Sequence, residues 1–234
     1  MKPAVLFDLG NTLVAYYRST EFLPILEIAI ADVLSELAAR NLAHMPFDAA
    51  FAAAQLENVE ASDFRFTPIT ERFERIFEIS LVADETLGTT LCRIFLNPIF
   101  AVGRLYADAL PALRRLRAAG HPVAIVSNTP WGSPPELWRE ELELLSLTDA
   151  VDGIVLCGDV GWRKPAPAVF EAAAAQVGRR PDQCIFVGDD LQWDIAGSEA
   201  ARMRAVLIDR NSAHRAFTGE RVENLDELSA IVEA

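Results

Sequence analysis

Short apolar runs that end at glycine, asparagine or acidic residues recur along the chain. Runs of this kind are typical of parallel strands that are buried on both faces of a sheet. The runs that predict such strands are Ala4 to Leu9, Val123 to Ser127, Gly153 to Leu156, Ile185 to Val187 and Ala205 to Ile208. From Val123 onward they alternate with the helical patterns "PELWREELELL", "PAVFEAAAAQV" and "DIAGSEAARM". This alternation predicts a doubly wound α/β layer with a parallel sheet.

The alternation fails between Leu13 and about Tyr106, where amphipathic helical patterns follow one another. These patterns cover Glu21 to Arg40, Phe47 to Asn58, Thr70 to Ile79 and Asp84 to Phe95. We therefore expect residues 1–14 and 107–234 to form the α/β core and residues 15–106 to form an inserted helical cap. An insert at the carboxyl end of the first strand would lie over the crevice where open α/β sheets bind ligands, in the position of a lid.

Composition limits the partners and the compartment. The formal net charge of −13 argues against nucleic acid or an anionic membrane as a partner, because both need a basic face. The longest apolar stretch, "FLPILEIAIADVL", carries Glu27 and Asp32, so it predicts an amphipathic helix and not a membrane span. No signal peptide is expected from "MKPAVLFDLG". The three cysteines of the chain form no close pair in the sequence. We interpret them as core thiols of a cytoplasmic protein.

Polar groups follow three of the five predicted strands, and all of them would face one edge of the sheet. With one lysine that precedes a helix, the group is Asp8, Ser127, Asn128, Asp189, Asp190, Asp194 and Lys164. Clustered acids raise each other's pKa unless a cation joins them, so the group suggests Mg²⁺. Phosphate then fits as the ligand, held by Lys164 and the Ser127 hydroxyl while Asp8 attacks phosphorus. Taken singly, each of these residues is more often a cap, a turn former or a solvated side chain.

Four motifs together resemble those of the haloacid dehalogenase (HAD) superfamily of phosphohydrolases. They are "FDLGNTL", "IVSNT", "RKPAP" and "FVGDDLQWDIAGSEAARM", in the family's order and over nearly the whole chain. The first two are weak signals by themselves, whereas the ordered set is specific. The resemblance implies a Rossmann-like core with a helical cap inserted after the first motif.

The resemblance also implies roles for the residues in these motifs. Asp8 would be the nucleophile that becomes an aspartyl phosphate, and the substrate phosphate would be bound by Ser127, Asn128 and Lys164. A Mg²⁺ ion would be held by Asp8, Asp189 and the carbonyl oxygen of Gly10. Its surrounding waters would be held by Asp194 and Asp190.

The first motif departs from the family pattern at Gly10, where family phosphatases usually carry a second aspartate. That residue serves as general acid and base, which typically contributes about 10²–10⁴ in rate. Phosphomutase chemistry is disfavoured without it. Three explanations remain open: another residue supplies the proton, the leaving group needs little protonation, or the protein binds phosphate without turnover. Candidate donors in the insert are Tyr16, Tyr17, Arg18, Glu21 and Asp63.

The leading hypothesis is a Mg²⁺-dependent phosphatase that acts on a small phosphorylated metabolite. One alternative is a catalytically weak or silent phosphate-binding protein, suggested by Gly10. A less favoured one is a 2-haloacid dehalogenase, which typically has an aromatic residue at the place of Gly10 and does not need the acid at Asp189. Three tryptophans near the motifs, Trp131, Trp162 and Trp193, either line a substrate entrance or pack loops on the core. Neither the substrate nor the oligomeric state follows from the sequence.

Overall fold

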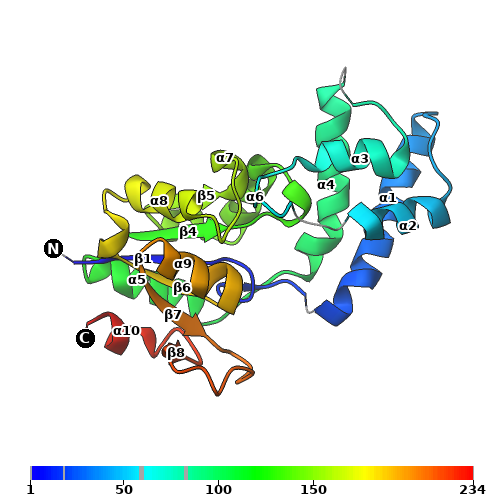
Figure 1. Cartoon of the computed structure of the whole chain (residues 1–234). Coiled ribbons are helices and arrows are strands. Elements are labelled where there is room, and N and C mark those ends of the chain that lie inside the picture. Colours follow the sequence, from blue (N-terminus) through cyan, green and yellow to red (C-terminus); the bar gives the residue numbers. More distant parts are fainter. Residues whose placement is uncertain (1, 18, 58–60, 82–83, 234) are drawn as a thin grey trace.

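A parallel sheet forms the centre of the protein. The computed structural model describes residues 2–17, 19–57, 61–81 and 84–233. Within them, six strands form one sheet in the order β5-β4-β1-β6-β7-β8 (Figure 1). Their bounds are Ala4–Phe7 (β1), Val123–Ser127 (β4), Gly153–Leu156 (β5), Cys184–Gly188 (β6), Arg204–Ile208 (β7) and Glu220–Val222 (β8). The predicted strands are confirmed, although the first ends at Phe7. The edge strand β8 was missed because Val222 is its only fully buried residue.

Helices cover both faces of this sheet, so it is doubly wound. Side chains along β1 alternate between two hydrophobic clusters, because successive residues of a strand point to opposite faces. Val5 and Phe7 pack in one cluster with α5, α6 and α10, whereas Ala4 and Leu6 pack in the other with α8 and the residues that directly follow α9. The bounds of these helices and of α7 are Ala109–Ala118 (α5), Pro135–Leu144 (α6), Cys157–Val160 (α7), Pro167–Gln176 (α8), Gly197–Ala200 (α9) and Leu228–Val232 (α10).

A helical insert interrupts the sheet fold after the first motif. The described residues of the insert form four α-helices, Phe22–Ala39 (α1), Phe47–Glu57 (α2), Ile69–Phe77 (α3) and Glu85–Val102 (α4). They stand together at one end of the molecule, away from the sheet (Figure 1). A short antiparallel ribbon of β2 (Val14–Ala15) and β3 (Arg104–Leu105) joins the insert to the core. All four helices lie within the expected range 15–106, whose end points stay a prediction.

Two helices differ clearly from their predicted extents. The last helix of the insert was expected to end at Phe95, but α4 continues through Pro98 to Val102 because Ile99 is buried in the core. The helix expected from Asp194 begins earlier, at Leu191, with a π-helical segment that ends at Ala196. Short 3-10 turns complete several connections: Ser19–Glu21, Pro130–Gly132, Thr148–Ala150 and Pro181–Gln183.

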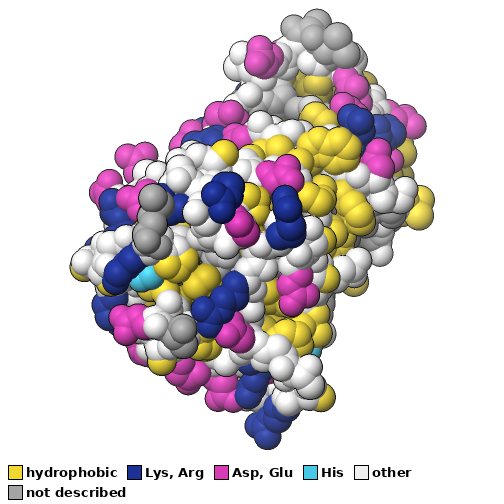
Figure 2. Space-filling model, turned by 60° about the vertical axis from the view of Figure 1, so that its left-hand side comes forward, with side chains coloured by type: hydrophobic (Ala, Val, Ile, Leu, Met, Phe, Trp, Pro, Cys, Tyr) yellow, Lys and Arg dark blue, Asp and Glu magenta, His cyan; other side chains and the backbone are white. Residues whose placement is uncertain are grey.

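The surface carries charges of both signs. On the face shown in Figure 2, the coloured Lys and Arg side chains are interspersed with Asp and Glu and form no continuous basic stripe. Among the described helices, none has both the length and the apolar character needed to cross a membrane.

Candidate active site

Strand register brings the ends of the first and last motifs together. Phe7 of β1 lies opposite Ile125 of β4 and Val187 of β6. The backbone N–H of Asp8 continues this pairing by donating to the carbonyl oxygen of Val187 at 2.9 Å. Since the three strands are parallel, the residues that follow them leave at the same edge of the sheet. Asp8 and Asp189 are therefore neighbours although they are distant in sequence.

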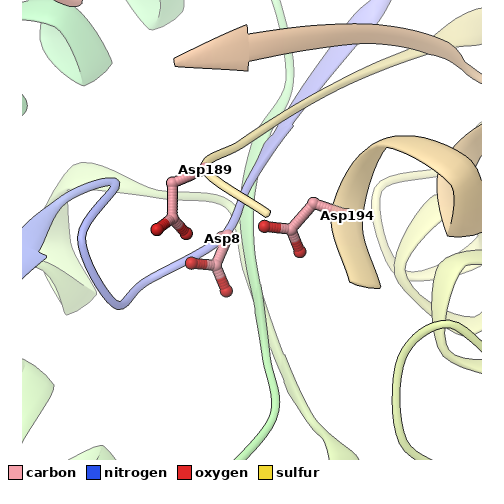
Figure 3. A group of neighbouring side chains, drawn as sticks. All are labelled: Asp8, Asp189 and Asp194. Atoms are coloured by element: carbon pink, nitrogen blue, oxygen red, sulfur yellow. The ribbon is translucent and has the colours of Figure 1, made fainter. Parts of the chain in front are cut away.

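Three carboxylates converge at this edge. Asp8, Asp189 and Asp194 each offer an oxygen that lies within 4.8 Å of the others. Figure 3 shows their side chains pointing toward one another from three separate segments. Asp8 is 7% exposed and Asp194 only 1%. Burial is the main reason why the pKa values of Asp8 and Asp189 are raised above the ordinary carboxyl range.

Lys164 is the cation of the cluster. Its Nζ lies 2.5 Å from Asp8 Oδ1 and 2.6 Å from Asp194 Oδ1, and its side chain is 3% exposed. Burial would lower the pKa of this ammonium group, but the charges of Asp194 and Asp8 outweigh burial and raise it. Lys164 therefore remains positively charged and joins the first and fourth motifs.

Asn128 holds the backbone of Lys164 in place. Its side-chain oxygen accepts from the Lys164 N–H at 2.8 Å, and its Nδ2 donates to the Lys164 carbonyl oxygen at 3.1 Å. Both ends of the amide are thus used for positioning the lysine. The expected phosphate contact of Asn128 stays a prediction, to which this positioning role is added.

Ser127 is the last residue of β4, the strand beside β1. It is 6% exposed, and its hydroxyl donates to the carbonyl oxygen of Asn128 at 3.2 Å, which is at the long end for such a bond. A hydroxyl held this weakly can turn toward a ligand at the same sheet edge.

The loop after β6 explains the position of Asp194. Asp190 caps the helical segment that begins at Leu191, because its Oδ1 accepts from the N–H groups of Gln192 and Trp193, both at 2.7 Å. One turn later, Asp194 Oδ2 accepts from the N–H of Asp190 at 3.1 Å. Gly188 lies close to Asp194. A Cβ at Gly188 would be only 2.4 Å from Asp194 Oδ2, so the absence of a side chain there leaves room for the Asp194 carboxylate. Asp190 is not one of the three converging acids, and its expected role beside the metal stays a prediction.

The donor set fits Mg²⁺. Three carboxylates against one ammonium leave an excess of negative charge in a buried place, which a divalent cation would neutralise. All the candidate ligands are oxygens, as a hard cation prefers. Besides burial, the charges of Asp8 and Asp194 raise the pKa of Asp189, so a bound cation would relieve their mutual repulsion.

A family model confirms the resemblance inferred from the motifs. The model of the haloacid dehalogenase-like hydrolases matches residues 2–202. The chain belongs to the haloacid dehalogenase-like hydrolases.

The relatives of this hydrolase include proteins named for two chemistries. It is 29% identical to the ribulose-1,5-bisphosphate 5-phosphatase of Halopiger xanaduensis over 251 residues, which covers 99% of this chain and 100% of that protein. It is 34% identical to (S)-2-haloacid dehalogenase 1 of Pseudomonas sp. strain CBS-3 over 105 residues, 45% of this chain and 44% of that one. The crystal structure of a HAD phosphatase from Thermococcus onnurineus superposes with a TM-score of 0.71 at 24% identity, covering 99% and 98% of the two chains. This last likeness shows the shared fold.

Side chains of the insert of this hydrolase contact the three tryptophans near the motifs. The Arg65 guanidinium lies 4.6 Å from the ring centroid of Trp162, and Phe64 packs edge-on against Trp193 with centroids 5.9 Å apart. Trp131 is 3% exposed. It packs between Phe22 and Phe95 of the insert, at 6.3 Å and 5.4 Å. All three tryptophans therefore contact side chains of the insert, and both expectations for them, a substrate entrance and packing of loops on the core, stay predictions.

The sequence interpretation missed a polar group on the loop after β7. Arg210 donates to both oxygens of Asp108 and to the carbonyl oxygen of Thr12 in the first motif, and its guanidinium lies 3.7 Å from the Tyr106 ring centroid. With His214, Arg210 lines a cavity of about 90 Å³ that also contains Asp189. The position of Arg210 just after a strand end was the available signal. A larger cavity, of about 530 Å³, is lined mainly by residues of the insert together with Pro134 and Glu136 of the core, and no predicted site residue lines it.

The raised pKa of Asp189 predicts a pH-dependent stability. Above about pH 4 the folded protein keeps a proton on this carboxyl that the unfolded chain has lost, so stability falls as pH rises. In EDTA, we expect the free energy of unfolding to fall between about pH 5 and 8, by up to ~1.4 kcal/mol per pH unit for one carboxyl. Asp189→Asn removes this titration and should flatten the curve. Thermal denaturation of both proteins checks this, and parallel curves would contradict it.

Proposed function

We propose that this hydrolase is a Mg²⁺-dependent phosphatase that acts on a small phosphorylated metabolite through an aspartyl-phosphate intermediate. The observation that carries the proposal is the buried cluster in which Lys164 bridges Asp8 and Asp194 beside Asp189. Such a cluster provides a nucleophile, a fixed cation and a set of oxygen ligands at one point. One relative that aligns over 99% of this chain is named ribulose-1,5-bisphosphate 5-phosphatase.

Each residue has a defined part in this reaction. The Asp8 carboxylate attacks phosphorus, the bond from phosphorus to the ester oxygen breaks, and the leaving alcohol takes up a proton. The Lys164 ammonium and the Ser127 hydroxyl hold the phosphoryl oxygens, whose charge they stabilise during the transfer. Bound through Asp8, Asp189 and the Gly10 carbonyl, Mg²⁺ would supply further positive charge at these oxygens. Water then attacks the phosphorus of the aspartyl phosphate, which releases phosphate and restores Asp8.

Dehalogenase chemistry has less support from these residues. In that reaction the Asp8 carboxylate would attack carbon, which needs neither a metal ion nor a third acid. The convergence of Asp189 with Asp8 and Asp194 instead favours a site built for a cation. A silent phosphate-binding protein would keep the cluster but show no turnover.

A phosphatase panel with and without Mg²⁺ tests the proposal. We expect hydrolysis of one or more small phosphate esters that requires Mg²⁺ and stops when EDTA is added. Asp189→Asn should weaken Mg²⁺ binding by at least about tenfold, measured by calorimetric titration, because it removes one charged ligand. Equal Mg²⁺ affinity in the two proteins would show that Asp189 is not a ligand. Defluorination or dechlorination of 2-haloacids without metal would support the dehalogenase alternative.

A further inference from the structure

Arg210 reaches across one edge of the sheet to the turn that follows β1. It comes two residues after β7, and in the sheet β6 lies between β7 and β1. The Nη2 of Arg210 donates to the carbonyl oxygen of Thr12 at 2.8 Å. This bond therefore spans the end of β6, where Asp189 follows the strand. One cavity is lined by Arg210, Asp189 and Asn11 together, which agrees with this path.

The turn that receives this bond carries Gly10, the expected carbonyl ligand of the metal ion. Its own backbone closes it, because the N–H of Asn11 donates to the carbonyl oxygen of Val14 at 2.7 Å. Asn11 has a positive φ of 54°, which asparagine tolerates better than most residues. Thr12 is fully buried, so its carbonyl oxygen needs a partner within the protein. Arg210 provides that partner from outside the turn.

The guanidinium of Arg210 is itself held on two further sides. It donates to both carboxylate oxygens of Asp108, at 2.9 and 3.0 Å, and both side chains are largely buried. Asp108 Oδ2 also accepts from the N–H of Leu225 at 2.8 Å. The ring of Tyr106 lies against the guanidinium, whose carbon is 3.7 Å from the ring centroid. A planar group with bidentate and stacked partners is held in one orientation.

We propose that Arg210 is a positioning residue for the metal site. By holding the turn after β1 at the end of β6, it sets the place of the Gly10 carbonyl relative to Asp189. This role rests on the function proposed above, in which both groups bind Mg²⁺. A Mg²⁺ ion demands oxygen ligands in nearly ideal octahedral positions, so a turn that can shift weakens its binding.

Arg210 does not serve as the proton donor that is missing at Gly10, because a guanidinium keeps its protons in proteins. Among the candidates for that donor in the insert, Asp63 is largely exposed and pairs with its neighbour Arg65. Glu21 is exposed as well, and Arg18 lies outside the described residues.

Calorimetric titration of Arg210→Lys with Mg²⁺ tests the inference. Lysine keeps a positive charge beside Asp108 but lacks the planar fork that joins Asp108 to Thr12. We expect the Mg²⁺ affinity to fall about tenfold, at the lower end of what the loss of a group behind a metal ligand costs. Arg221→Lys is the matched control, because Arg221 pairs with Asp209, the neighbour of Arg210, at 2.9 Å. This control should bind Mg²⁺ as the wild type does.

Steady-state rates separate positioning from a direct part in the reaction. For Arg210→Lys, the Mg²⁺ concentration that gives half-maximal hydrolysis should rise about tenfold. The kcat at saturating Mg²⁺ should stay close to that of the wild type, because Arg210 acts through the turn and not on the substrate. A fall in kcat that saturating Mg²⁺ does not reverse would overturn the positioning role.

The titrations also distinguish failure of this role from failure of the proposed function. Equal Mg²⁺ affinity in Arg210→Lys and the wild type, or an equal loss in Arg221→Lys, would overturn the inference while the phosphatase proposal stands. If Arg210→Lys melts below the assay temperature, Asp108→Asn takes its place, since it weakens the anchor of Arg210. Its Mg²⁺ affinity should fall about threefold, and an unchanged affinity would overturn the inference. A wild type that binds no Mg²⁺ would overturn the proposed function and this role with it.

Discussion

Asp8→Asn is expected to abolish ester hydrolysis, with a loss of roughly 10⁴-fold or more, because the amide cannot attack phosphorus. The fold should persist. Lys164 keeps its bond to Asp194 at 2.6 Å, so the change leaves no buried charge unpaired. One negative charge also leaves a crowded acidic cluster. We therefore expect the Tm in EDTA to equal or exceed that of the wild type.

Steady-state hydrolysis and thermal denaturation check this prediction together. Asp182→Asn is a suitable control, since Asp182 is an exposed carboxylate paired with Arg180 outside the acidic cluster. It should keep wild-type activity. Beryllofluoride with Mg²⁺ should bind wild type at the Asp8 carboxylate and fail to bind Asp8→Asn. Substantial turnover by a folded Asp8→Asn would identify a different nucleophile.

Gly10→Asp is expected to raise turnover of alkyl phosphates by roughly 10²-fold, within the range that a general acid typically contributes. The structure leaves room for the new side chain. An added Cβ at Gly10 has nothing within 4 Å, and Gly10 is not among the glycines with positive φ. A side chain at this position therefore meets neither a clash nor a left-handed backbone. The gain should be smaller for p-nitrophenyl phosphate, whose leaving group needs little protonation.

Melting temperature is measured beside the rates of Gly10→Asp. A neutral effect with unchanged Tm would mean that another group already transfers the proton. An inactive wild type together with an active Gly10→Asp would favour the silent, phosphate-binding alternative.

The residues at the strand ends show which features of the site local sequence patterns can predict. The run Ala4 to Leu9 predicted a buried strand with an acid at its end, and the run Ile185 to Val187 predicted a strand that ends just before Asp189. Both strands were found, the first of them ending at Phe7. The contacts of Asp190 were not predicted. Next to Asp189 in sequence, it was expected to hold waters around the metal ion, which stays a prediction, and its carboxylate caps the following helical segment. Two adjacent aspartates have the same local signal, and the direction of the backbone after β6 separates their roles.

Local patterns were sufficient for the α/β class, the helical insert and the four motifs, because apolar periodicity and motif order are properties of neighbouring residues. Contacts between distant residues were not predictable in this way. Lys164 and Asp8 are 156 positions apart, and their bond depends on the paths of β1 and of the loop before α8. Separate segments also meet where Asn128 is hydrogen-bonded to the backbone of Lys164 and where the hydroxyl of Tyr16 is buried. Strand register, close packing and burial set such contacts, and these are properties of the folded chain as a whole.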